Sequence, residues 1–263
     1  MKPTELKLCG LPAVQARWRK DPDSFLRLFF DQKTGRSVGA ICRELAATRR
    51  VYRCVEAAEL EKVAGSHHHG GIVAIVAQEA SRVPTAEDVA GWVKACEPVL
   101  VLDRIGNPHN LGALARTAAF LGVRHIVLAD IPGASRGNDA AYRVSEGGLE
   151  AATLWSVEDM GHFLKRLAKA GYAVVGAATR DGKLLRPGQG RRLVLGQAAS
   201  AGPAPVALVL GNEEHGMSPD VAAACTRLVT LEGSDAVESL NVSVAGALLM
   251  WELFGVRPRV QGA

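Results

Sequence analysis

The sequence predicts an α/β protein whose main part is a mostly parallel sheet with helices on both faces. Helical patterns near 110–121, 158–170 and 242–254 alternate with short apolar runs. Strands that alternate with helices in this way are typical of parallel sheets, because each crossover connection needs a helix. The runs that have the length of buried strands lie at 99–103, 125–129, 173–177, 206–210 and 228–231.

A smaller α/β module precedes this part and covers residues 1–78. Helical periodicity around 24–30 and 40–48 predicts two helices, and short runs at 51–55 and 72–77 predict two strands. The module is therefore expected to have a small core of its own.

The stretch after this module is interpreted as a connection between two domains. Residues 81–88 are polar, include Pro84 and have no periodicity. We therefore place a linker at 79–95 and a second domain at 96–258.

Length and composition are those of an ordinary globular protein. A chain of 263 residues can bury a substantial core, and 48% hydrophobic with 22% charged residues is a common balance. The 5% aromatic content argues against an exposed aromatic surface for stacking bases. The first residues lack the apolar core of a signal peptide, and no run of about 18 apolar residues is present. We expect a cytoplasmic protein that does not contact membranes.

The cysteines and histidines indicate neither a disulfide framework nor a metal site. The five cysteines are scattered and never form a Cys-x-x-Cys pair, so we expect reduced thiols. His67, His68 and His69 are adjacent, and consecutive residues cannot all face one ion. We therefore expect no metal.

The excess of positive charge lies in the first third of the chain. Residues 1–78 hold 13 Lys and Arg against 8 Asp and Glu, whereas residues 79–263 hold 18 against 19. A basic module joined to a near-neutral one fits a domain that binds a polyanion, attached to a domain with another task. A solvated face on a small domain explains the charge equally well.

Three polar blocks interrupt the apolar pattern, and each follows a short apolar run. They lie at 110–116, 211–218 and 238–245. In open parallel sheets, ligands bind beyond the carboxyl ends of the strands, where loops enter helices. The three blocks are therefore expected to build one shared site.

Two other classes of enzyme are disfavoured. No Gly-x-Gly-x-x-Gly spacing follows any predicted strand, which argues against a Rossmann dehydrogenase. The run from Gly133 through Ser135 to Gly137 matches the Gly-x-Ser-x-Gly pattern of a hydrolase, but Pro132 and Gly133 separate it from the preceding strand. No amphipathic helix follows it, so we interpret this run as a flexible active-site loop.

The polar blocks, with the residues before them, closely resemble the three motifs of the SpoU, or TrmH, family of RNA ribose 2′-O-methyltransferases. This family belongs to the SPOUT superfamily. The motifs correspond to 103–118, 208–218 and 239–245, and the resemblance covers 96–255 in the right order and spacing.

The N-terminal module is similar to the small domain, related to ribosomal protein L30e, that binds substrate in many members of the family. The similarity lies at 8–14 and 69–72. Two positions depart from the family pattern: Glu214 stands where many members have glycine, and Gly70 replaces a common glutamine. Neither departure removes a proposed catalytic group.

The resemblance implies a fold that periodicity could not predict, in which the C-terminal part of the sheet is tied into a trefoil knot. It also implies that S-adenosylmethionine binds in this knot, largely through backbone groups of the second and third motifs. Gly211, which has no Cβ, would let the ligand approach the backbone closely. The implied cofactor-binding positions are Leu210, Gly211, Asn212, Leu231 and Leu240.

The resemblance implies a catalytic pocket lined by Asn110, Arg116, Glu213, Ser239 and Asn241. Arg116 matches an arginine proposed to activate the ribose 2′-hydroxyl. Because a guanidinium with a pKa above about 12 is not ordinarily deprotonated, we expect Arg116 first to clamp the phosphate next to the target ribose. Simpler interpretations remain: Arg116 as a solvated helix residue, Glu213 as a surface carboxylate, and the other three as helix caps.

The resemblance further implies a homodimer that acts on structured rRNA or tRNA and not on DNA. The apolar stretch 242–254 is interpreted either as part of the dimer interface or as core. The appended small module favours rRNA by analogy with other members. Two alternatives are an RNA-binding or assembly factor without catalysis and a methyltransferase that modifies a base nitrogen. The five intact polar residues argue against the first, and the first motif argues against the second.

Overall fold

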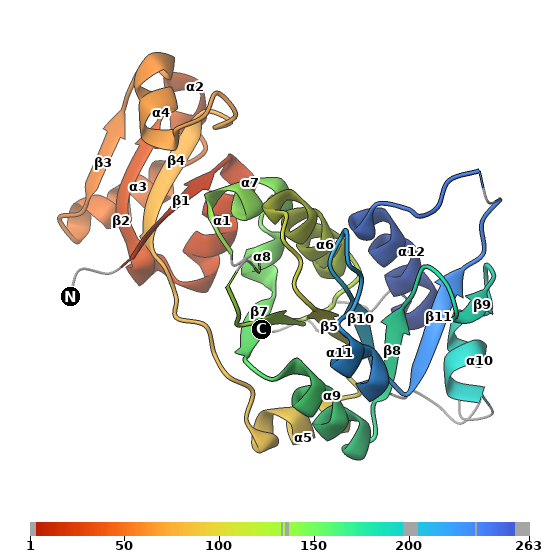
Figure 1. Cartoon of the computed structure of the whole chain (residues 1–263). Coiled ribbons are helices and arrows are strands. Elements are labelled where there is room, and N and C mark those ends of the chain that lie inside the picture. Colours follow the sequence, from red (N-terminus) through yellow and green to blue (C-terminus); the bar gives the residue numbers. More distant parts are fainter. Residues whose placement is uncertain (1–3, 133, 135–136, 197–204, 235, 256–263) are drawn as a thin grey trace.

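The computed structural model describes residues 4–132, 134, 137–196, 205–234 and 236–255. In this part of the chain the strands form one four-stranded and one seven-stranded sheet. Figure 1 shows the small N-terminal domain, coloured red to orange, beside the larger sheet with its helices. Three residues of the hydrolase-like run, Gly133, Ser135 and Arg136, lie outside the described residues.

The first sheet has the strand order β1-β4-β2-β3. Its central strand β4 (Ile72–Ala77) pairs antiparallel with β1 (Glu5–Cys9) and β2 (Phe25–Phe30), and β3 (Val51–Cys54) pairs parallel with β2. The two predicted strands and the predicted helix at 40–48 are confirmed. The helices of this domain are α1 (Leu11–Lys20), α2 (Gln32–Gly35), α3 (Gly39–Ala47) and α4 (Ala57–Ala64).

The predicted helix at 24–30 is wrong, because these residues form strand β2 after a 3-10 turn at Pro22–Ser24. A short apolar run cannot be assigned to helix or strand by periodicity alone. Pairing with β4 on one side and β3 on the other decides the outcome, and a bulge between Phe25 and Arg27 adjusts the register.

The second sheet has the order β7-β6-β5-β10-β8-β11-β9, and every recorded strand pair in it is parallel. The five predicted strands are confirmed, whereas β7 and β9 were not predicted. In chain order the strands are β5 (Val99–Leu102), β6 (His125–Ala129), β7 (Thr153–Val157), β8 (Ala173–Ala177), β9 (Lys183–Leu185), β10 (Val206–Leu210) and β11 (Arg227–Leu231).

Helices cover both faces of this sheet, as predicted. The three predicted helices appear as α6 (Pro108–Phe120), α9 (Met160–Lys169) and α12 (Val242–Phe254). Leu100 and Leu208 pack in one core with α6 and α12, while Val101 and Val209 pack in a second core with α5, α9 and α11. The remaining helices are α5 (Ala86–Lys94), α7 (Asp139–Ser145), α8 (Gly148–Ala151), α10 (Gly190–Leu195) and α11 (Pro219–Ala224).

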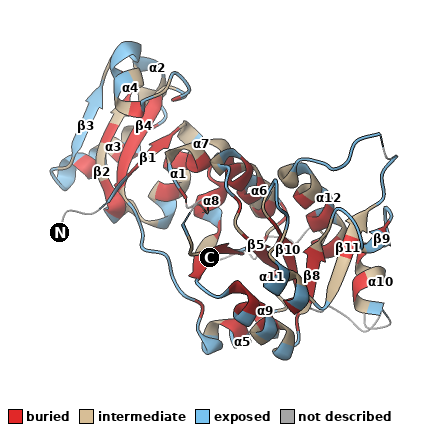
Figure 2. Ribbon diagram, viewed as in Figure 1, coloured by how far each residue is buried: buried red, intermediate tan, exposed pale blue. Residues whose placement is uncertain are grey.

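Part of the segment expected as a linker is helical. Helix α5 begins with a capping box in which the Thr85 side chain accepts from the Asp88 N–H and the Asp88 carboxylate accepts from the Thr85 N–H. Val89 and Trp92 of α5 are buried in the second core, so this helix packs with the larger sheet. Figure 2 shows the exposed stretch that leads to it from β4.

The two domains contact each other through helices α7 and α8. The Lys7 N–H donates to Asp139 Oδ1 at 2.9 Å, and Gln78 Nε2 donates to the carbonyl of Gly137 at 3.1 Å. One apolar core continues from the first sheet to the second. Among the described residues, none of the helices combines the length and hydropathy needed to cross a bilayer.

Candidate functional site

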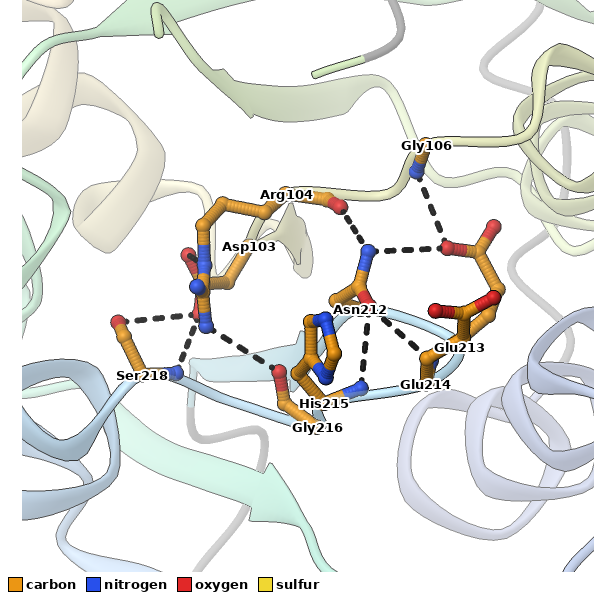
Figure 3. Close-up of polar contacts among 9 residues, drawn as sticks. All are labelled: Asp103, Arg104, Gly106, Asn212, Glu213, Glu214, His215, Gly216 and Ser218. Carbon is orange, nitrogen blue, oxygen red and sulfur yellow. Dashed lines mark hydrogen bonds and ion pairs between the residues drawn. The ribbon is translucent and has the colours of Figure 1, made fainter. Parts of the chain in front are cut away.

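The first motif begins at a buried aspartate directly after β5. Asp103 Oδ2 accepts hydrogen bonds from the Ser218 N–H (2.7 Å) and the Ser218 hydroxyl (3.1 Å). Arg104 Nε donates to Asp103 Oδ1 at 3.3 Å, and its backbone has a φ of 60°, which is uncommon for a residue other than glycine. Figure 3 shows Asp103 joining the first motif to the second.

Asn212 organises the loop of the second motif. Its backbone exchanges two 3.0 Å hydrogen bonds with Gly216, and its side-chain oxygen accepts from the N–H groups of Glu214 and His215. Its side-chain Nδ2 donates to the carbonyl of Arg104 at 2.8 Å. The side chain of Asn212, whose backbone was predicted to bind cofactor, thus shapes the loop and ties it to the first motif (Figure 3).

Gly211 is required by the loop itself. A Cβ at this position would lie 2.2 Å from the backbone nitrogen of Met217 and 2.3 Å from the carbonyl carbon of Gly216. The sequence predicts that a ligand takes this space, whereas in the structure the protein backbone fills it. Any other residue at 211 would push the loop away from the end of β10.

Glu213 binds the first motif through several hydrogen bonds. Its carboxylate accepts from the N–H groups of Gly106 (3.0 Å) and Asn107 (3.1 Å) and from Asn110 Nδ2 (2.9 Å). Burial raises the pKa of Glu213, but these hydrogen bonds outweigh it and hold the pKa below its ordinary value. Glu213 is therefore a fixed anion that organises the loops, and it is poorly suited to act as a base.

Asn110 and Asn241 connect the three motifs. Asn110 is buried, and while its Nδ2 donates to Glu213, its Oδ1 accepts from Asn241 Nδ2 at 3.2 Å. The alternative that Asn110 caps α6 is wrong, because Asn107 is the cap and accepts from the N–H of His109. Asn241 does cap α12, since its Oδ1 accepts from the N–H of Ser243 at 2.8 Å. The structure thus brings Asn110, Glu213 and Asn241 together.

Arg116 lies apart from this group. Its recorded polar contact within the described part of the chain is an ion pair of 2.9 Å between Nη2 and Glu146 Oε2, and both side chains are more than half exposed. Arg116 is six residues after Asn110, which places it almost two turns farther along α6 and on another face. Within one chain, Arg116 therefore does not contact Asn110 or Asn241 directly.

The other predicted site residues lie around the ends of β10 and β11. Ser239 is exposed, Leu240 is exposed by about half, and Leu231 packs at the edge of the core. The side chain of Leu210 is fully buried, and its carbonyl accepts from the N–H of Asp103, so Leu210 positions the first motif.

The third-motif loop fits a cofactor that is held by backbone groups. Of its described residues, 233–234 and 236–240, none makes a recorded backbone hydrogen bond, and all are exposed. Leu240 and Val237 add exposed apolar side chains that suit the face of an aromatic ring. Exposed backbone N–H and C=O groups beside apolar side chains suit the polar and apolar parts of S-adenosylmethionine.

Sequence reasoning gave no role to Asp103, Ser218, Asn107 or Glu146. The first two carried a signal, because an aspartate that ends a strand and a serine that ends the second motif can meet at neighbouring strands.

The described ranges hold no group of three His, Cys, Asp or Glu arranged as metal ligands, and the cysteines are unbridged.

Two family profiles match the chain. The SpoU rRNA methylase family matches residues 97–251, and the profile for RNA 2′-O ribose methyltransferase substrate binding matches residues 7–81. The chain belongs to the SpoU rRNA methylase family. The family match contains the three motifs described above, and the second match covers the first sheet except the first two residues of β1.

Curated relatives of this SpoU protein extend over nearly its whole length. The tRNA/rRNA methyltransferase YfiF of Escherichia coli O157:H7, whose name marks it as uncharacterized, is 32% identical over 94% of this chain and 67% of its own. The 23S rRNA (guanosine-2′-O-)-methyltransferase RlmB of Nitrosomonas europaea is 30% identical over 93% of this chain and 89% of its own.

Solved structures of SpoU proteins share its fold. The methyltransferase AviRb of Streptomyces viridochromogenes in complex with AdoMet has a TM-score of 0.67 and 22% identity, covering 94% of this chain and 88% of its own. An AdoMet-bound rRNA methyltransferase of Sinorhizobium meliloti has a TM-score of 0.71 and 20% identity, covering 94% and 86%. The predictions of the family, of a SPOUT-type parallel sheet, of an RNA methyltransferase and of S-adenosylmethionine as its cofactor are confirmed.

Proposed function

We propose that this SpoU protein transfers a methyl group from S-adenosylmethionine to the 2′-hydroxyl of a ribose in ribosomal RNA. The observation that carries this proposal is the hydrogen-bonded set of Asn110, Glu213 and Asn241, one residue from each motif. Relatives about 30% identical over most of the chain are named for this reaction on 23S rRNA.

The division of labour follows the two sheets. The domain at 1–78 binds structured RNA, and the domain at 96–258 catalyses methyl transfer. The segment 79–95 connects the two domains. The excess of Lys and Arg in the first domain supports this assignment, since the phosphate backbone of RNA provides the counter-charge.

The cofactor lies against the backbone at Leu210, Gly211 and Asn212 and against Leu231 and Leu240. The described residues 233–234 and 236–240 of the loop between β11 and α12 are exposed, which supports this placement. We also propose that the chain is knotted here. Membership of the SpoU family supports this proposal, and the strand order β5-β10-β8-β11 and the packing of α12 on α6 are compatible with it.

The roles of the residues follow from their contacts. S-adenosylmethionine supplies an electrophilic methyl group on a sulfonium when it is bound. Asn110 and Asn241, fixed to each other and to Glu213, orient the ribose by their amide groups. Ser239, two residues before Asn241 in the chain, is exposed. Arg116 stays protonated and would hold the neighbouring phosphate. As the ribose oxygen bonds to the methyl carbon, the bond from that carbon to the sulfonium sulfur would break, and the hydroxyl proton would pass to water.

A homodimer would complete this site. The face of α12 that does not enter the core exposes Val244, Leu248 and Trp251, which recur at spacings of four and three residues. Phe120, four residues after Arg116 on α6, is also exposed. A second copy that covers these side chains would lie next to Arg116, so the site would draw residues from both subunits.

The experiment that tests the function is methyl transfer in vitro. The protein, which we propose to be cytoplasmic, is incubated with labelled S-adenosylmethionine and total rRNA or total tRNA from a strain that lacks it. Incorporation into rRNA is expected. Incorporation into tRNA alone would show that the substrate is tRNA and not rRNA. Cofactor binding without incorporation into either RNA would favour a non-catalytic assembly factor.

A further inference from the structure

Glu146 forms an ion pair with the guanidinium of Arg116. Glu146 Oε2 lies 2.9 Å from Arg116 Nη2, and the two side chains are 52% and 57% exposed. The contact uses one corner of the guanidinium, which has five N–H donors in a planar fork. A carboxylate binds an arginine through the same donors as a phosphate.

The backbone of Glu146 is fixed in an unusual conformation. It follows α7 with a φ of 46°, in the left-handed region that few residues other than glycine adopt. Ser145 before it is buried, and its hydroxyl donates to the carbonyl of Tyr142 at 2.9 Å. The carboxylate thus extends from an anchored turn.

Close packing brings this turn to Arg116. A Cβ at Gly148 would lie 2.7 Å from the Cα of Arg116, so the backbone of α8 touches the backbone of α6 at the arginine itself. Glycine at 148 permits this approach, and the approach places Glu146 within reach of the guanidinium.

The substrate-binding domain supports the turn from the other side. A Cβ at Gly147 would lie 3.2 Å from the Cβ of Ala16 and 3.3 Å from the carbonyl oxygen of Pro12, both in α1. Arg17, on the same helix, forms a buried ion pair of 2.8 Å with Glu150 of α8. Both domains therefore determine where the carboxylate of Glu146 lies.

We propose that Glu146 is a specificity-determining residue that competes with RNA phosphate for Arg116 and so weakens binding of RNA that is not substrate. The proposal rests on the proposed function in one respect: Arg116 is taken as a phosphate ligand. An exposed ion pair is weak, so a phosphate placed by the whole bound substrate can replace the carboxylate. A phosphate of unrelated RNA must displace Glu146 and is repelled by the negative charge of Glu146. Unrelated RNA lacks the other substrate contacts that would offset this cost.

The test uses a single-stranded uridine oligonucleotide as unrelated RNA and measures its dissociation constant by fluorescence anisotropy at several salt concentrations. Glu146→Gln removes the charge, and Glu146→Asn does so with a residue that adopts positive φ more readily. Both variants should bind about three- to tenfold more tightly at low salt. The slope of log K against log salt should steepen by about 0.7, as expected for one more phosphate contact with a single strand.

The matched control is Glu232→Gln. Glu232 also forms an exposed pair with an arginine, at 2.8 and 2.9 Å from Arg186, so the variant removes the same charge at another place. Its affinity should remain within twofold of the parent protein. Adding Arg116→Ala to Glu146→Gln should remove the tightening.

Two results would overturn the proposal: Glu146 variants that bind no more tightly than Glu232→Gln, or tightening that persists without Arg116. The readout is binding and does not depend on methyl transfer. A protein that fails to methylate RNA while Glu146→Gln tightens binding would therefore contradict the proposed function and leave this inference standing.

Discussion

Arg17 of the small domain and Glu150 of the larger domain form an ion pair of 2.8 Å in which each side chain is only 1% exposed. The pair joins α1 to α8, and Lys20 Nζ lies 3.9 Å from the second carboxylate oxygen. Burial raises the pKa of Glu150, against the opposing effect of Arg17. A buried ion pair therefore joins the two domains. Removal of either Arg17 or Glu150 would leave the other charge buried without a partner.

Breaking this pair should destabilise the protein strongly. Arg17→Met leaves a buried carboxylate without its partner, and such losses cost about 3–5 kcal/mol. The free energy of unfolding is measured by urea denaturation. The double variant Arg17→Met with Glu150→Leu should recover much of the loss, because both charges are replaced by apolar groups. A loss below about 1 kcal/mol in the single variant would show that water reaches the pair.

The hydrogen bonds to Glu213 predict a specific dependence of stability on pH. Because its pKa is lowered on folding, the stability it contributes is complete above the ordinary pKa of 4.5 and is lost as the pH falls through the lowered value. The difference in unfolding free energy between the parent protein and Glu213→Gln should thus be largest near neutral pH and shrink below 4.5. Glu214→Gln, at the adjacent exposed glutamate, is the matched control for loss of one charge from this loop. A constant difference would contradict the role of Glu213 as a fixed anion.

The close packing of Gly211 against the backbone of Gly216 and Met217 predicts that position 211 tolerates no side chain. Gly211→Ala places a Cβ against the backbone of Met217 and must open the loop. We expect cofactor affinity, measured by calorimetry, to fall at least about tenfold, as it would for a distortion costing 1.4 kcal/mol or more. The control is Gly91→Ala in α5, where a Cβ would meet no atom within 4 Å. Unchanged affinity in Gly211→Ala would mean that the loop does not hold the cofactor.

The exposed face of α12 predicts a dimer that a charge can disrupt. Leu248→Glu should shift the molar mass in solution, measured by light scattering, from two chains to one, because a charge buried at an interface lacks a partner. Val83→Glu changes an equally apolar residue that is 70% exposed near the start of α5 and should leave the dimer intact. A parent protein that is already monomeric at micromolar concentration would refute the interface.

The sequence predicted the elements that have local signals. Five of the seven strands of the larger sheet and helices α6, α9 and α12 follow from apolar runs and periodicity, and the three motifs follow from polar residues at strand ends. Strand β2 could not be predicted, because its short apolar run becomes a strand only when it pairs with β4 and β3. Strand β9 has three residues, too few for any periodicity.

The contacts that organise the site could not be predicted for a different reason. Glu213 and Asn110 are 103 residues apart, and Arg17 and Glu150 are 133 apart, so nothing local links them. The cap of α6 at Asn107 was misassigned to Asn110 as one alternative, because both are asparagines near the start of the same helix. The separation of Arg116 from Asn110 becomes visible only once α6 is placed.

The chemical position of the transferred methyl group distinguishes a ribose 2′-O-methyltransferase from an enzyme that modifies a base. RNA labelled by the protein and S-adenosylmethionine is digested in alkali, which cannot cleave next to a methylated 2′-oxygen, and the products are separated. We predict a labelled, alkali-resistant dinucleotide, and an Arg116→Ala variant that binds the cofactor almost normally but yields almost none of it. Label in mononucleotides that carry a methylated base would contradict transfer to the ribose, and full activity in Arg116→Ala would contradict the role of this arginine.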